Sequence, residues 1–211
     1  EDGLSKLRAR NQRSGRMLQL PRLPRGTLAL PTFSPDGRRL AFFLSTATRP
    51  ADLFVLDLRA RRLKQITRSM LGGLEPKTMV EPRLIRYQSS DGQRIAAWLY
   101  QPKNLKAGQR APVVISIHGG PEAQEHPQYG HGLYQYWLSR GIGVLAPNIR
   151  GSTGYGKRFQ QLIYRDWGGG ELRDVERAAK YLRRLKWVDA KRLGLFGASF
   201  GGFVVLSALS R

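Results

Sequence analysis

The length and composition of the chain exclude several classes of protein. Its 211 residues, 41% of them hydrophobic, are enough for one large or two modest globular cores. The absence of cysteine excludes disulfides, cysteine metal ligands and a thiol nucleophile. No apolar run approaches the roughly 18 residues that a membrane-spanning helix requires, so we expect a soluble protein without a membrane partner.

The formal net charge of +21 at pH 7 is the one unusual value in the composition. Such a charge often accompanies binding to nucleic acid or to anionic membranes. Here the basic residues are spread over both halves of the chain, and the densest runs, Arg59–Lys64 and Arg183–Lys186, lack the interleaved aromatic residues of single-strand binders. We therefore predict a solvated, arginine-rich surface and no nucleic-acid partner. A non-catalytic basic module with salt-sensitive binding is kept as an alternative.

The beginning of the chain carries no targeting signal. It starts with Glu1 rather than Met and has no charged-then-apolar leader. We expect either that a targeting segment was removed or that the true N-terminus is absent. The sequence does not fix the compartment, although the cytoplasm is slightly favoured over the periplasm.

The first third of the chain has the pattern of β-structure. Between Gly26 and Thr67 we predict a meander without helices, with turn residues at Ser34–Gly37 and strands at residues 39–44, 53–56 and 63–66. Such a meander is typical of a sandwich or of one blade of a β-propeller.

The rest of the chain alternates between strands and helices. A hairpin is predicted first, because residues 84–88 and 94–100 flank an Asp-Gly turn. Buried strands are then expected at residues 113–117, 144–146 and 193–196, and helices at 132–138 and 171–187. This alternation predicts a doubly wound α/β sheet. The composition changes near residues 68–78, so we divide the chain into domains at 1–76 and 77–211.

A strand-to-helix turn carries the candidate nucleophile. Gly197-Ala198-Ser199-Phe200-Gly201 matches GxSxG, with an apolar strand before it and a helix-forming stretch, Phe203–Leu209, after it. The glycines suit a sharp turn, because side chains there would collide with neighbouring elements. A packing turn with an ordinary serine is the structural alternative, but the strand and helix on either side favour Ser199 as a nucleophile.

A second glycine-rich turn follows the buried strand that ends at Ile117. In α/β-hydrolases an N–H from this loop joins the N–H of the residue after the nucleophile to hold the oxyanion. Here the donors are Phe200 and either Gly120 or Gly119, within His118-Gly119-Gly120-Pro121. A plain tight turn is the alternative interpretation.

The sequence does not offer a general base in the expected place. In α/β-hydrolases the triad follows the order Ser, acid, His. His118, His126 and His131 all precede Ser199, and no Asp, Glu or His follows it. Four further polar or aromatic residues are interpreted as structural: Arg150, Asp166, Trp167 and Asp174. For Arg150 a substrate-facing role is left open.

Four motifs in order resemble the catalytic domain of the prolyl oligopeptidase family of serine peptidases, closest to its acylaminoacyl-peptidase and dipeptidyl-peptidase-like branch. They are His118–Pro121, Pro147–Gly156, Gly169–Val175 and Gly197–Gly202. Upstream, Ser90–Gly92 followed by Ile95–Pro102 resembles that family's entry into the hydrolase domain. The meander before it is similar to the end of the β-propeller in these enzymes.

The resemblance implies a fold and an activity. The fold is the N-terminal half of an α/β-hydrolase domain, preceded by the end of a β-propeller and truncated at its C-terminus. The activity is hydrolysis of short peptides, with Ser199 as nucleophile, Phe200 and Gly120 as oxyanion donors, and no metal or cofactor. The triad Asp and His are missing, so we expect this chain to be inactive by itself. A carboxylic-ester hydrolase is the alternative enzyme, and the oligomeric state is not indicated.

Overall fold

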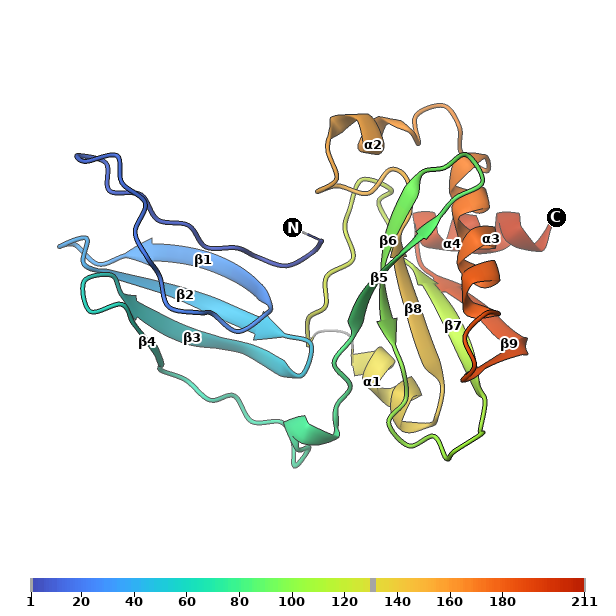
Figure 1. Cartoon of the computed structure of the whole chain (residues 1–211), viewed down its shortest axis with the longest axis horizontal. Coiled ribbons are helices and arrows are strands. Elements are labelled where there is room, and N and C mark those ends of the chain that lie inside the picture. The colour runs from blue at the N-terminus through green and yellow to red at the C-terminus, as the bar shows by residue number, and fades with distance from the viewer. Residues whose placement is uncertain (1, 130–131, 211) are drawn as a thin grey trace. The chain divides into compact units, whose positions relative to one another are not determined.

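The computed structural model describes residues 2–129 and 132–210, so that His131 lies outside the described residues. The chain forms two compact units. The first contains Gly3–Met79 together with the stretch that starts at His126, and the second contains Val80–Glu125 and the part of the chain from Gly132. Figure 1 shows a first unit whose regular structure is mainly β-strands, with one short 3-10 helix, η1 (Pro76–Thr78), and a second unit in which helices pack on a sheet.

The first unit is a four-stranded antiparallel meander. Its strands are β1 (Thr27–Phe33), β2 (Arg39–Thr46), β3 (Arg49–Asp57) and β4 (Arg62–Gln65), and they lie side by side in chain order. Alternate residues of β2 point into a small core, where Leu40, Phe42 and Leu44 are buried with Leu56. The meander predicted between Gly26 and Thr67 is therefore present.

The second unit contains a mixed five-stranded sheet. Its strands are β5 (Arg83–Gln88), β6 (Arg94–Tyr100), β7 (Ala111–Ile117), β8 (Gly143–Asn148) and β9 (Val188–Gly197), in the spatial order β5-β6-β8-β7-β9. The predicted hairpin is present as β5 and β6. β6 runs antiparallel to β8, whereas β7 is parallel to both β8 and β9. The parallel strands therefore bring the C-terminal ends of β7, β8 and β9 to one edge of the sheet.

Helices cover both faces of this sheet. They are α1 (Gly132–Ser139), α2 (Lys157–Gln161), α3 (Gly170–Leu182) and α4 (Phe200–Leu209). Leu99 lies in the core beneath α3 and α4, whereas its neighbour Tyr100 stacks edge-on against Tyr134 of α1. Because successive strand residues point to opposite faces, α1 covers the face opposite to α3 and α4. The short helix α2 was not predicted.

Helix α3 is shorter than the sequence pattern suggested. The predicted helix 171–187 ends at Leu182, and two i→i+3 hydrogen bonds then tighten the chain, from Arg184 N to Tyr181 O and from Leu185 N to Leu182 O. This tighter turn keeps Leu185 against the core, so the apolar spacing continues past the end of the helix. β9 begins at Val188, which requires the helix to stop earlier.

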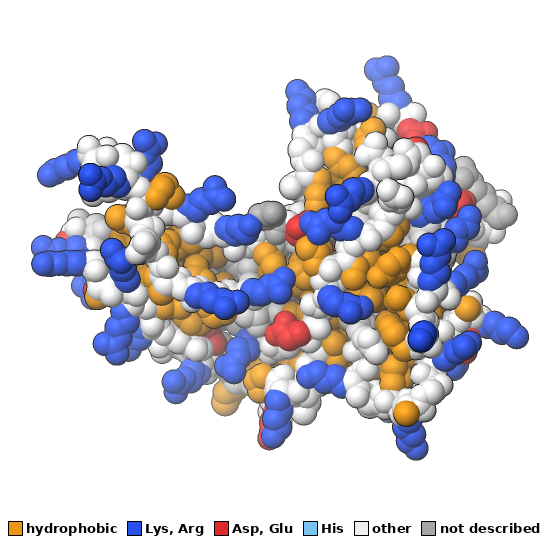
Figure 2. Space-filling model, in the orientation of Figure 1, with side chains coloured by type: hydrophobic (Ala, Val, Ile, Leu, Met, Phe, Trp, Pro, Cys, Tyr) orange, Lys and Arg blue, Asp and Glu red, His pale blue; other side chains and the backbone are white. Residues whose placement is uncertain are grey.

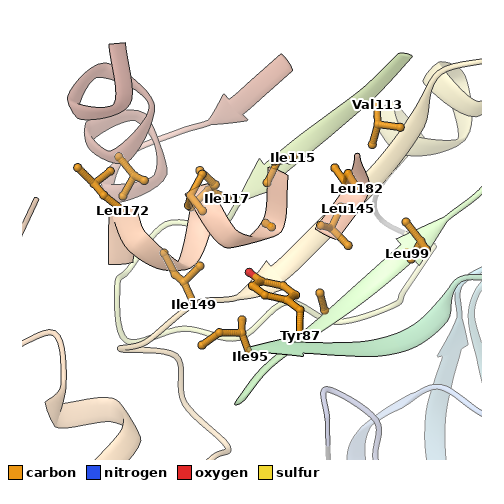
Figure 3. Packing of buried hydrophobic residues seen from close by; sticks show 14 of the residues in the cluster. Tyr87, Ile95, Leu99, Val113, Ile115, Ile117, Leu145, Ile149, Leu172 and Leu182 are labelled. Atoms are coloured by element: carbon orange, nitrogen blue, oxygen red, sulfur yellow. The ribbon is translucent and has the colours of Figure 1, made fainter. Parts of the chain in front are cut away.

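The main core lies between the sheet and the pair of helices α3 and α4. Figure 3 shows Ile115, Ile117 and Leu145 from the strands gathered with Leu172 and Leu182 from α3. Each of these side chains is buried. A fully buried aliphatic side chain contributes about 1.5–3 kcal/mol, so this cluster is the principal source of stability for the second unit.

A buried arginine connects three segments of the second unit. Arg150, in the loop after β8, donates from Nε and Nη2 to the carboxylate of Asp174 on α3, at 2.9 and 2.7 Å. Its Nη1 reaches Asp91 in the β5–β6 turn at 2.8 Å. The side chain of Asp174 is fully buried and that of Asp91 is 41% exposed. Of the two roles left open for Arg150, the structural one accounts for these contacts.

The surface is rich in basic side chains. Figure 2 shows Lys and Arg dispersed over the visible face, with few acidic residues between them. Within residues 2–129 and 132–210 no helix has the length and apolar character required to cross a membrane.

The ion pair of Arg150 and Asp174 should make a measurable contribution to the stability of the second unit. Removing the carboxylate in Asp174→Ala leaves the buried guanidinium with only the partly exposed Asp91 as a counter-charge and should lower the free energy of unfolding by at most about 3–5 kcal/mol. Asp91→Ala removes a partly exposed partner of the same arginine and should cost less than about 1 kcal/mol. Urea unfolding followed by circular dichroism measures both, and equal losses would contradict this account.

Candidate active site

Ser199 occupies the turn between β9 and α4. Its backbone has φ 55° and ψ −124°, a conformation that L-residues rarely adopt and that is often found at functional sites. The residue is exposed, and its side chain makes no capping hydrogen bond to α4. The hydroxyl is thus presented at the surface of the second unit, as the GxSxG pattern predicts.

The two glycines of this motif allow backbone segments to approach closely. A Cβ on Gly201 would lie 2.1 Å from the carbonyl oxygen of Ile117, and one on Gly197 would lie 2.5 Å from the Gly201 carbonyl. Real Cβ atoms do not come so near, so a side chain at Gly201 would push α4 away from the end of β7, and one at Gly197 would push α4 away from the end of β9. The glycines therefore set the position of Ser199 relative to the loop after β7.

The loop after β7 lies directly against Ser199. A Cβ built on Gly119 would stand 3.4 Å from Ser199 Cβ and 3.8 Å from Ser199 Oγ. Phe200 is the first residue of α4, where backbone N–H groups have no acceptor within the helix. The structure thus brings the predicted nucleophile beside the Gly119–Gly120 loop and the N-terminus of a helix, whose dipole favours negative charge.

His118 is engaged away from Ser199. Its Nδ1 lies 2.8 Å from the carbonyl oxygen of Gly119, and its Nε2 lies 2.9 Å from Ser152 Oγ. The interpretation that His118 is not the base rests on chain order and stays a prediction. Among the described residues, no cluster of three His, Asp or Glu side chains could hold a metal ion.

The segment before α3 packs against the start of α4. Asp166 accepts a hydrogen bond from Gly170 N at 2.8 Å, and the Trp167 ring meets the Phe200 ring edge-on with centroids 5.0 Å apart. Asp166 thus holds the glycine run before α3, and Trp167 packs against the start of α4, which are structural contacts for both residues. Glu171 accepts from Gly168 N and is fully buried, which the sequence pattern did not indicate.

A buried acid in the loop after Pro121 was also missed. Glu125 is only 4% exposed, and its backbone N–H donates to Asn148 Oδ1 at 2.8 Å. Burial raises the pKa of its carboxyl to about 8, although a hydrogen bond with Tyr134 partly opposes the shift. Its only sequence signal is an acidic residue in a loop, which is indistinguishable from a solvated one.

The chain is similar to known proteins of one peptidase family. The sequence model of the prolyl oligopeptidase family matches residues 129–211. A Bacillus subtilis protein named uncharacterized peptidase YuxL is 32% identical over 177 residues, which are 82% of this chain and 26% of that protein. Dipeptidyl-peptidase 5 of Schizosaccharomyces pombe is 33% identical over 135 residues, covering 63% of this chain and 19% of that protein.

Solved structures give the same result. A puromycin-hydrolyzing peptidase of Mycobacterium tuberculosis superimposes with a TM-score of 0.87 and 25% identity, covering 100% of this chain and 33% of that one. The chain thus spans about a fifth to a quarter of the length of these two relatives and a third of this solved neighbour.

The glycine contacts at the turn predict opposite outcomes for two adjacent substitutions. Gly201→Ala should destabilise the second unit by about 1–3 kcal/mol, because the new methyl group would overlap the Ile117 carbonyl. Gly202→Ala meets nothing nearer than 3.5 Å and should stabilise α4 by about 0.5–1 kcal/mol. Urea unfolding of the two variants provides the comparison, and a shift in the same direction for both would disprove it.

Glu125 should make stability fall as the pH rises. Its folded pKa of about 8 lies above its usual value of 4.5, so its contribution is complete below about pH 4.5 and is lost as the pH increases through 8. Relative to Glu125→Gln, the wild-type protein should lose at most about 1.4 kcal/mol per pH unit in that window. Urea unfolding at several pH values tests this, with Glu176→Gln on the exposed side of α3 as a matched control.

Proposed function

Because this chain belongs to the prolyl oligopeptidase family, we propose that it carries the nucleophile of a serine peptidase and that Ser199 is that nucleophile. The observation that carries the proposal is the placement of Ser199. Its hydroxyl is exposed on a turn with unusual backbone, with the Gly119 backbone packed beside it and a helix N-terminus behind it. This arrangement suits a reaction that develops negative charge next to the nucleophile.

The proposed chemistry is acyl transfer. Ser199 Oγ attacks the carbonyl carbon of the scissile peptide bond, its proton passes to a general base, and the carbonyl oxygen becomes an oxyanion. Backbone N–H groups of Gly120 and Phe200 stabilise that charge. Collapse of the intermediate releases the amine and leaves an acyl-Ser199 ester, which water then hydrolyses.

The substrate is proposed to be a short peptide. Relatives of the chain carry the name dipeptidyl-peptidase 5, and one solved neighbour is a puromycin-hydrolyzing peptidase. We assign residues 1–76 as the terminal portion of a β-propeller and 77–211 as the N-terminal half of an α/β-hydrolase domain. The meander of β1–β4 and the mixed sheet with helices on both faces support this division.

The acid and base of the triad are proposed to lie in a continuation of the hydrolase sheet past β9. In the described part of the chain β9 pairs only with β7, and Leu206 and Leu209 of α4 are 69% and 78% exposed. A strand edge beside exposed leucines is the surface that further strands and helices would cover. The chain continued through a downstream Asp and His is called the extended protein below.

A fluorophosphonate probe tests the proposed nucleophile. The extended protein should form one adduct, mapped to Ser199 by mass spectrometry, whereas the 211-residue chain alone should label at least about 10³-fold more slowly because no base activates the serine. Ser199→Ala is the control for the site of labelling. Labelling of Ser199→Ala at the wild-type rate would refute the role of this serine as the nucleophile. Rapid labelling of the 211-residue chain would refute the proposal that this chain lacks a general base.

A further inference from the structure

The loop that follows β7 carries an exposed carboxylate close to the candidate nucleophile. Glu122 is exposed, and its backbone nitrogen lies 2.7 Å from the position that a Cβ of Gly120 would occupy. The neighbouring Gly119 packs against Ser199, since a Cβ built on it would stand 3.4 Å from Ser199 Cβ. A bound peptide extends by about 3.5 Å per residue from its scissile bond, so its next one or two residues can reach Glu122.

The hydrogen-bond partners of Glu122 are both uncharged. Gln160 Nε2, in the last turn of α2, donates to Glu122 Oε2. The hydroxyl of Tyr164 also bonds this carboxylate, and the bond raises the pKa of the phenol because the carboxylate stabilises its protonated form. Within residues 2–129 and 132–210 no lysine, arginine or histidine forms an ion pair with Glu122. The two donors therefore orient the carboxylate without neutralising it.

The absence of a basic partner contrasts with the composition of the chain. Lysine and arginine together number 36, against 15 acidic residues, and an exposed acid such as Asp189 pairs with Arg192 at 2.6 Å. A carboxylate bonds more strongly to a cationic N–H donor than to a neutral one. In a peptide the cationic donors are the N-terminal ammonium group and the basic side chains. The oriented carboxylate of Glu122 is therefore a site for such a group.

We propose that Glu122 is a specificity-determining residue, whose carboxylate binds a positively charged group of the peptide substrate, either its N-terminal ammonium group or a basic side chain. This inference rests on the proposed role of Ser199. Gln160 and Tyr164 hold the carboxylate in place, and Glu122 takes no part in breaking the peptide bond. A purely structural role, in which Glu122 only ties its loop to α2, predicts no dependence on the charge of the substrate.

Three variants separate the charge of Glu122 from its structural contacts. Glu122→Gln keeps a hydrogen-bond acceptor for Gln160 and Tyr164 but removes the negative charge. Gln160→Lys leaves Glu122 intact and supplies an ammonium group from within the chain, which should occupy the carboxylate in place of the substrate. Glu176→Gln is the matched control, because it removes the same charge from an exposed position on α3.

The affinity for peptides is measured by calorimetry in the extended protein carrying Ser199→Ala, so that the peptides stay intact. An acetylated, uncharged peptide is compared with the same peptide bearing a free N-terminus. Two further acetylated peptides carry lysine in place of norleucine on one or the other side of the scissile bond. At least one charged peptide should bind about 10-fold more tightly than the uncharged one, and the preferred peptide identifies the source of the cation.

The variants should change this preference in a defined way. Glu122→Gln and Gln160→Lys should bind all four peptides with the affinity of the uncharged one, whereas Glu176→Gln should keep the preference. With Ser199 restored, Glu122→Gln should raise KM for the preferred peptide about 10-fold and leave kcat within about twofold. The reason is that the contact is equally strong in the ground state and in the transition state.

Equal affinity for all four peptides in the protein with Glu122 intact would overturn the proposal. Weaker binding of the uncharged peptide in Glu122→Gln would also overturn it, because a structural tie predicts that result. An equal loss of preference in Glu176→Gln, or a loss confined to kcat in Glu122→Gln, would contradict it as well. Retained peptidase activity in Ser199→Ala would instead overturn the proposed function and leave the comparison of affinities as it is.

Discussion

The contact between the start of α4 and the end of β7 constrains the rest of the second unit. Gly201 lies against the Ile117 carbonyl so closely that a methyl group cannot fit between them. This contact brings the N-terminus of α4 next to the end of β7, and the residue before the helix, Ser199, has an unusual backbone conformation. The position of the candidate nucleophile therefore follows from backbone packing, and the side chains around it adjust to that position.

Much of the fold around Ser199 could be predicted from local patterns in the sequence. The hairpin of β5 and β6, the buried strand β7 and the turn at Ser199 could be predicted because each depends on residues that are adjacent in the chain. The end of α3 could not. The apolar spacing continues to Leu185 whether the backbone is α-helical or in a tighter turn, so the spacing does not show where the helix ends. The helix ends at Leu182 because β9 begins at Val188.

Long-range polar contacts were beyond the reach of sequence reasoning. Arg150 is separated in the sequence from its partners Asp174 and Asp91 by 24 and 59 residues. His118 and its partner Ser152 are separated by 34 residues. No periodicity or motif connects such pairs, because they depend on how the strands are ordered in the sheet. The same holds for Glu125, whose raised pKa reflects burial that only the folded chain creates.

These contacts form one connected path from the core to the candidate site. Asp174 on α3 holds the backbone of Arg150, the turn beside it fixes Ser152, Ser152 meets the ring of His118, and His118 holds the Gly119 carbonyl. Each of these hydrogen bonds is short, and most of the residues that form them are buried. The loop beside Ser199 is therefore positioned by contacts that begin in the interior of the unit. The groups proposed to hold the oxyanion can thus be arranged before any general base is present. A base would then need only to reach Ser199 Oγ, because the geometry of the acceptor side is already set.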